Sequence, residues 1–135
     1  MALLTWSKRY SVGVDAWDQE HSILFGILND FHSSMLKGQA QAVAGLLLNK
    51  LMDYTRQHFS TEERMMTEAH HPRLDHHRAL HHELTAQVVE FTGRYKHGDQ
   101  SMYLPLRKFM RDWLDNHVLK EDRECAAWLN QHGIH

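Results

Sequence analysis

Two stretches near the centre of the sequence each place a pair of metal-ligand side chains four residues apart. His58 and Glu62 form one pair, and His77 and His81 form the other. On an α-helix that offset is one turn plus about 40°, with about 6 Å of rise, so both side chains of a pair leave the same face. One such pair is ordinary. Two pairs in a short chain with 13 histidines predict a metal ion held between helices.

Apolar residues around these pairs recur at helical spacing and predict four amphipathic helices. We expect the helices at about 18–37, 41–66, 73–96 and 101–119, after an arm at 1–17 and before a short tail at 121–135. Four such helices with short connections are typical of an antiparallel, up-down-up-down four-helix bundle. The fold class is therefore all-α, with one domain over residues 1–135.

Each predicted helix carries a potential metal ligand among its apolar-face positions. These side chains are His21 in the first helix, His58 and Glu62 in the second, His77 and His81 in the third, and His117, with a carboxylate nearby, in the fourth. A lone histidine on an apolar face is more often a hydrogen-bonded core residue than a ligand. Because an unpaired polar group in a core costs roughly several kcal/mol, agreement among all the helices favours a metal that compensates for it.

The doublets His76-His77 and His81-His82 leave a choice of register on the third helix. His77 and His81 align with Leu84 on the apolar face, whereas His76 and His82 fall toward its flanks. We therefore take the first two as ligands. The remaining histidines are expected to be solvated or capping residues: His32, His70, His71, His76, His82, His97, His132 and His135.

Composition limits the partners and the compartment. With a hydrophobic fraction of 42%, a net charge of −2 and no basic block, the chain is expected to be globular and to bind no nucleic acid. No apolar run approaches the roughly 20 residues that cross a bilayer, so no membrane insertion is expected. The single cysteine, Cys125, excludes an internal disulfide framework and fits a reducing compartment. We expect a cytoplasmic monomer without a signal peptide.

Taken in order, the motifs resemble the hemerythrin pattern, in particular that of single-domain bacteriohemerythrins. The resemblance covers nearly the whole chain. Any one motif is weak, but the ordered set with compatible spacings is specific. The set comprises Asp18-Gln19-Glu20-His21, His58-Phe59-x-x-Glu62-Glu63, His77-x-x-x-His81 and Trp113-Leu114-x-x-His117-Val118-x-x-x-Asp122.

The resemblance implies a non-haem di-iron site with oxygen and carboxylate bridges. By position, one iron would be bound by His77, His81 and His117, the other by His21 and His58, and both would be bridged by Glu62 and Asp122. Two octahedral irons offer about twelve positions, and these ligands with a bridging oxygen fill all but one. The open position lies on the iron with two histidines.

Reversible O2 binding is the function that the resemblance implies, for oxygen transport, storage or sensing and without enzymatic turnover. Phe59 and Trp113 are the candidate walls of an apolar O2 pocket. Delivery of O2 to an oxygen-consuming enzyme would be one use of the bound ligand. The alternative is a di-iron enzyme or redox protein that handles peroxide, nitric oxide or O2 reduction. Ligand chemistry alone also admits manganese or cobalt. A structural zinc site is disfavoured because it is usually closed by about four ligands.

Two departures from a regular pattern surround the expected bridging aspartate. His117 and Asp122 are five residues apart, which on a regular α-helix separates their directions by about 140°. We therefore predict a π-bulge or a helix break between residues 117 and 122. Hemerythrins often carry a tyrosine three residues after this aspartate, whereas this chain has Cys125, which we expect to be a buried spectator.

Overall fold

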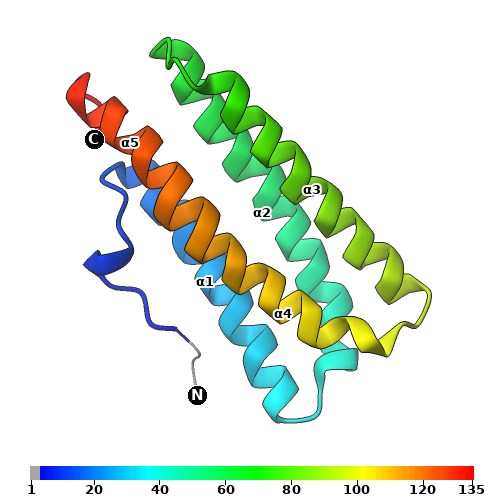
Figure 1. Ribbon diagram of the computed structural model, residues 1–135. Coiled ribbons are helices and arrows are strands. Elements are labelled where there is room, and N and C mark those ends of the chain that lie inside the picture. The colour runs from blue at the N-terminus through cyan, green and yellow to red at the C-terminus, as the bar shows by residue number, and fades with distance from the viewer. Residues whose placement is uncertain (1–3) are drawn as a thin grey trace.

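The computed structural model describes residues 4–135, and within that range the chain is helical without any β-strand. Four antiparallel helical rods lie side by side, as Figure 1 shows. This confirms the predicted four-helix bundle. The first three rods are α1 (Asp15–Leu36), α2 (Ala40–Glu68) and α3 (Leu74–Lys96). The fourth is built from α4 (Tyr103–Asp112), η3 (Trp113–Asp122) and α5 (Arg123–Gln131).

The half of the bundle near the α1–α2 turn is packed mainly with apolar side chains. Leucines dominate it because their unbranched β-carbons suit helices and their branched ends interlock between rods. The members of this packed layer are Ile27, Phe31, Leu47, Leu48, Leu51, Leu106 and Met110, and they leave almost no free space between them. This layer holds the helices in register for the polar cluster described below.

Two residues with positive φ end the first two helices. Gly38, at φ 69°, donates its N–H to the carbonyl of Met35, and Gln39 donates to Ser34, which closes α1 in a Schellman arrangement. His70 takes the corresponding conformation after α2, at φ 57°, although it is not a glycine. The turn that follows lets α3 run back along α2.

The C-terminal segment differs from the expected short tail at 121–135. Instead of ending near residue 119, the fourth rod continues without a break through η3 and α5 to Gln131. The apolar face also continues, because Cys125, Ala126 and Leu129 are buried against the bundle. Burial of that face stabilises two more turns of helix, and only residues 132–135 extend beyond it.

The N-terminal arm, expected at 1–17, ends where α1 begins at Asp15 and packs on that helix. Residues 1–3 fall outside the described range. The arm contains one turn of 3-10 helix, η1 (Lys8–Tyr10); a similar turn, η2 (Gln100–Met102), precedes α4. Trp6 and Tyr10 pack edge-on against Phe25 of α1, with ring centroids 5.1 and 4.7 Å away. None of the helices in residues 4–135 combines the length and hydrophobicity that crossing a bilayer requires.

Candidate metal centre

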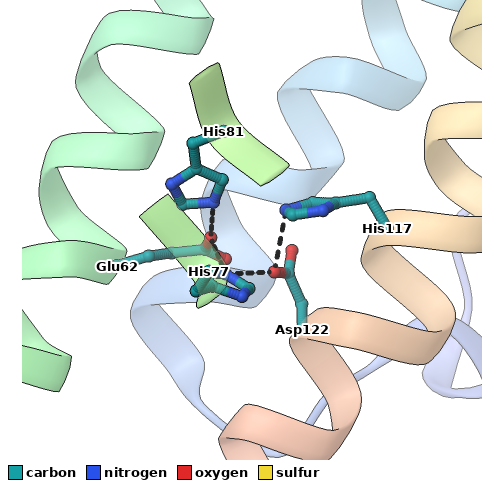
Figure 2. A group of neighbouring side chains, drawn as sticks. All are labelled: Glu62, His77, His81, His117 and Asp122. Atoms are coloured by element: carbon teal, nitrogen blue, oxygen red, sulfur yellow. Dashed lines mark hydrogen bonds and ion pairs between the residues drawn. The ribbon is translucent and has the colours of Figure 1, made fainter. Parts of the chain in front are cut away.

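All seven predicted ligand side chains meet in the core of the bundle. Each is at most 5% exposed, and together they come from every rod. They are His21 of α1, His58 and Glu62 of α2, His77 and His81 of α3, and His117 and Asp122 of η3. Figure 2 shows five of them converging from three rods. The structure therefore joins residues up to 101 positions apart in the sequence.

One side of this cluster, the three-histidine set, consists of His77, His81 and His117. Glu62 Oε1 lies 3.1 Å from Nε2 of His77 and 3.0 Å from Nε2 of His81. Asp122 Oδ1 lies 2.9 Å from Nε2 of His77 and 3.1 Å from Nε2 of His117 (Figure 2). Each imidazole thus directs its Nε2 toward one oxygen of a shared carboxylate.

The opposite side, the two-histidine set, consists of His21 and His58 and uses the other oxygen of each carboxylate. Glu62 Oε2 lies 2.9 Å from His58 Nε2 and 3.6 Å from His21 Nε2. Asp122 Oδ2 lies 2.9 Å from His21 Nε2 and 3.9 Å from His58 Nε2. Each carboxylate therefore offers one oxygen to each set, which is the arrangement that bridges two cations.

Unpaired buried atoms test whether these residues fit metal ions. His58 Nε2 and Glu62 Oε2 lie close together, yet neither has a hydrogen-bond partner, and the same holds for His117 Nε2 and Asp122 Oδ1. Buried polar atoms that lack hydrogen bonds are costly, and ligand atoms aimed at a common point are satisfied by a cation there. The cluster divides into two groups whose ligand atoms all lie within 4.8 Å of one another. The residues fit two metal ions.

A π-helix brings the bridging aspartate into the site. The segment η3 bonds each residue to the fifth one before it, so side chains five apart stand about one turn apart on the same face. His117 and Asp122 therefore point into the same cluster. This confirms the predicted distortion between residues 117 and 122. A regular α-helix would have turned the carboxylate away from it.

Carboxylates also hold the second ring nitrogen, Nδ1, of two of these histidines. His58 Nδ1 lies 2.9 Å from Oε1 of Glu20, and His81 Nδ1 lies 2.7 Å from Oε2 of Glu63. Such carboxylates orient a ligand imidazole and make it more basic. The roles of Glu20 and Glu63 were not predicted from the sequence. The one sequence signal for them is that they stand next to His21 and Glu62 in the motifs.

Cys125 is buried, as expected, and lies outside both candidate metal-binding groups, but it is not a spectator. Its thiol is buried, and Sγ lies 3.5 Å from Nδ1 of His77, within hydrogen-bonding distance for sulfur. When Nε2 of His77 binds a cation, Nδ1 carries the proton and donates it to the sulfur, which is a weak neutral acceptor. The continuation of the helix through α5 places Cys125 there. His77 is therefore oriented less strongly than His58 and His81.

Without a metal, the two carboxylates favour the protonated forms of the neighbouring imidazoles. Burial lowers the pKa of His77, but its neighbours Asp122, Cys125 and Glu62 outweigh burial and raise that pKa to about 12. The pKa values of His21 and His58 are also raised, against burial, by Asp122 and Glu62. Burial and mutual repulsion oppose ionisation of the two carboxyls. Nearby histidines nevertheless hold the pKa values of Glu62 and Asp122 well below their usual range.

The two predicted pocket residues lie in the core beside the cluster. The ring of Phe59 stacks on His81, with 3.7 Å between centroids, and lies 5.5 Å from Trp113. Both side chains are buried. The ring of Tyr54 lies 5.9 Å from that of Trp113 and stacks on His58 at 5.2 Å between centroids. An aromatic layer therefore covers one side of the cluster.

Histidines outside the cluster largely follow the expected register. His76 and His82 are exposed on α3, as the choice of His77 and His81 requires. His71 is buried rather than solvated, at 6% exposure, and its Nε2 lies 3.2 Å from the carbonyl oxygen of Cys125. Its Nδ1 accepts the N–H of Arg73 just before α3, which fits the expected capping role. His71 ties the start of α3 to α5 because the longer fourth rod covers it.

The fold and the cluster define a four-helix bundle that can hold two cations in its core through histidine and carboxylate ligands. The family model of the hemerythrin HHE cation binding domain matches residues 12–129. A bacteriohemerythrin of Stenotrophomonas maltophilia is 33% identical over 132 residues, covering 98% of this chain and 85% of that protein. A bacteriohemerythrin of Methylococcus capsulatus is 29% identical, covering 96% of this chain and 99% of that protein.

A solved structure described as wild-type hemerythrin has the same fold. It superposes with a TM-score of 0.83 at 28% identity, over 93% of this chain and 97% of that one. The chain belongs to the hemerythrin family. This family binds a non-haem di-iron centre, and its members mainly bind oxygen rather than catalyse reactions.

Proposed function

We propose that this chain binds O2 reversibly at a non-haem di-iron centre. The observation that carries the proposal is the division of each carboxylate between two sets of histidines. Glu62 and Asp122 each direct one oxygen to the three-histidine set and the other to the two-histidine set. The proposed ligands of the two irons are the seven residues His21, His58, Glu62, His77, His81, His117 and Asp122.

The inequality of the two sets supports O2 as the ligand. Both sets share the same carboxylates, but the two-histidine set has one imidazole fewer. With two imidazoles, one oxygen from each carboxylate and a bridging oxygen, six-coordinate iron at that set would keep about one position for a small external molecule. Two reduced irons held by these residues would supply the electrons that hold O2, and the same electrons would return to the irons when O2 leaves.

The protein's own residues orient the ligands and exclude water. Glu20 and Glu63 fix the rings of His58 and His81 through Nδ1. Phe59 and Trp113, as proposed pocket walls, cover the cluster with apolar surface. Exclusion of water keeps protons and solvent nucleophiles away from bound O2, which favours release of O2 over its reduction.

We further propose that the protein carries or stores O2 in the cytoplasm as a monomer and does not turn over a substrate. A single free cysteine supports a reducing compartment. Large exposed apolar side chains are scattered singly over α1, α2, α3 and α4, as in monomeric proteins. They are Ile23, Leu36, Leu46, Val89 and Leu104. Delivery to an oxygen-consuming enzyme would follow from a carrier role.

Metal analysis combined with optical spectroscopy tests the proposal. The purified protein should contain two irons per chain. After anaerobic reduction, admission of air should produce a visible charge-transfer band that fades under vacuum and returns with air. Iron that oxidises at once without a reversible band, or continuous consumption of a reductant, would instead establish a redox enzyme. Zinc, or no metal at all, would contradict the di-iron proposal.

A further inference from the structure

Tyr54 presents a hydroxyl group without a partner in the core. The residue is 5% exposed, and its hydroxyl oxygen is buried without any hydrogen bond. Leaving a hydroxyl unpaired in a core costs about 1–3 kcal/mol, so phenylalanine would be the more stable choice at a purely structural position. The hydroxyl therefore needs a partner that the protein chain does not itself supply.

The ring of Tyr54 points in the same direction as a ligand of the two-histidine set. Tyr54 precedes His58 by four residues on α2, and the two rings are stacked with 15° between their planes and 5.2 Å between centroids. Parallel stacked rings one turn apart leave the helix together. The hydroxyl group is therefore carried into the core alongside the imidazole of His58.

The shared carboxylates leave this side of the cluster free. Glu62 follows His58 by one turn on α2, and Asp122 follows His117 on η3. Because the second and fourth rods run in the same direction (Figure 1), both carboxylates approach from the C-terminal side of the histidines. Tyr54 and Trp113 lie one turn on the N-terminal side, with 5.9 Å between their rings. The side that lacks ligands thus faces these two aromatic residues.

We propose that the hydroxyl of Tyr54 donates a hydrogen bond to the small ligand bound at the open position of the two-histidine set. This inference rests on the proposed O2 binding and deepens it by naming a protein donor for O2. A tyrosine hydroxyl keeps its proton at neutral pH, and bound O2 accepts hydrogen bonds through electron density drawn from the metal. Tyr54 thereby slows release of O2 and holds it in one orientation.

The test compares Tyr54→Phe with Tyr103→Phe. Tyr103 begins α4 and packs on Phe31 with 6.3 Å between rings, in the apolar half of the bundle, so it controls for the loss of a phenol group. O2 release is followed by stopped-flow mixing of the oxygenated proteins with an O2 scavenger. Because a hydrogen bond to a charged acceptor is lost, we expect Tyr54→Phe to release O2 at least about ten times faster than the wild type. Tyr103→Phe should match the wild type.

Thermal unfolding of the metal-free proteins provides a readout that does not depend on bound iron. If the hydroxyl lacks a partner in the chain, metal-free Tyr54→Phe should be as stable as the wild type or more stable. A clearly destabilised or unfolded variant would show a structural partner and overturn the inference. Unchanged O2 release in a well-folded variant would overturn it as well. Failure of the wild type to bind O2 would instead overturn the proposed function, and is seen before any variant is made.

Discussion

The two sides of the metal cluster use the same carboxylates but differ in what surrounds them. The three-histidine set is held by residues of α3 and η3, and its His77 contacts both Glu62 and Asp122. The two-histidine set is held by α1 and α2, and the ring of its His58 stacks on Tyr54, whose hydroxyl has no hydrogen-bond partner. In the proposed function, the set with one imidazole fewer is the one that would keep a position for an external ligand.

The two sets also differ in how their imidazoles are oriented. His58 in one set and His81 in the other each have a carboxylate partner, at 2.9 and 2.7 Å. His77, at the centre of the three-histidine set, has the thiol of Cys125 at 3.5 Å. A neutral sulfur polarises an imidazole less than a carboxylate does. We therefore expect that one of the three histidines that bind iron in the three-histidine set, His77, is less basic than the others.

Removal of a shared carboxylate should have the largest effect, because it breaks both sides at once. We expect Glu62→Ala to lose both irons and to destabilise the metal-free fold by about 3 kcal/mol or more, since buried imidazolium groups lose their counter-charge. Iron per chain and thermal unfolding are the measurements. Glu83→Ala removes an exposed carboxylate of α3 and serves as the control. Two irons per chain in Glu62→Ala would refute the bridging role.

His77→Ala should have the second largest effect, and it distinguishes this buried histidine from the exposed histidines beside it on α3. Nε2 of His77 lies between the two shared carboxylates, at 3.1 Å from Glu62 and 2.9 Å from Asp122. We therefore expect loss of iron from the three-histidine set and collapse of the bridges that hold the other iron. His76→Ala and His82→Ala remove exposed histidines of the same helix and should keep two irons. Normal iron content in His77→Ala would contradict the register.

As the pH rises above neutrality, the stability of the metal-free protein should fall while its affinity for iron should rise. In the metal-free protein, the raised pKa values of His21, His58 and His77 contribute stability that is complete below pH 6.5. This contribution is lost as the pH rises through the pKa values of the folded protein, and that of His77 is about 12. The lowered pKa values of Glu62 and Asp122 contribute above about pH 4.5 and are lost in acid.

The free energy of unfolding of the metal-free protein should therefore fall from pH 6.5 to pH 9, by up to about 1.4 kcal/mol per pH unit for each histidine. Its unfolding temperature should fall with it. Iron competes with protons for the same nitrogens, so its affinity should rise over that range. Thermal unfolding and iron titration at several pH values check both slopes. A metal-free protein whose stability stays constant between these pH values would show that the histidines are neutral in the fold.

The smallest effects should come from replacing the residues that contact Nδ1 of the ligand histidines. We expect Glu63→Ala to weaken iron binding by about 10- to 100-fold through His81, and Cys125→Ala to weaken it by less. Cys125→Ser preserves a hydrogen-bonding group and controls for the loss of volume. Competition for iron with a chelator measures the ranking. Equal losses in Glu63→Ala and Cys125→Ala would show that sulfur orients His77 as strongly as a carboxylate orients His81.

Much of the centre was predictable because helical periodicity converts sequence spacing into direction. His58 with Glu62, and His77 with His81, share faces at one-turn spacing, so their convergence follows from the pattern of apolar residues around them. The five-residue offset of His117 and Asp122 predicted a distortion, and η3 is that distortion. The roles of Glu20, Glu63 and Tyr54 were not predicted, because they depend on distances between different helices.

The amino-acid sequence by itself determined the helical class, the face each ligand occupies and the need for a widened turn before Asp122, because these are local properties of the backbone. Tertiary structure decided which oxygen of each carboxylate faces which set of histidines. It also decided that the chain stays helical past residue 119, which brings Cys125 to His77 and buries His71. Those outcomes depend on packing between rods, where a shift of about 1 Å decides whether two side chains meet.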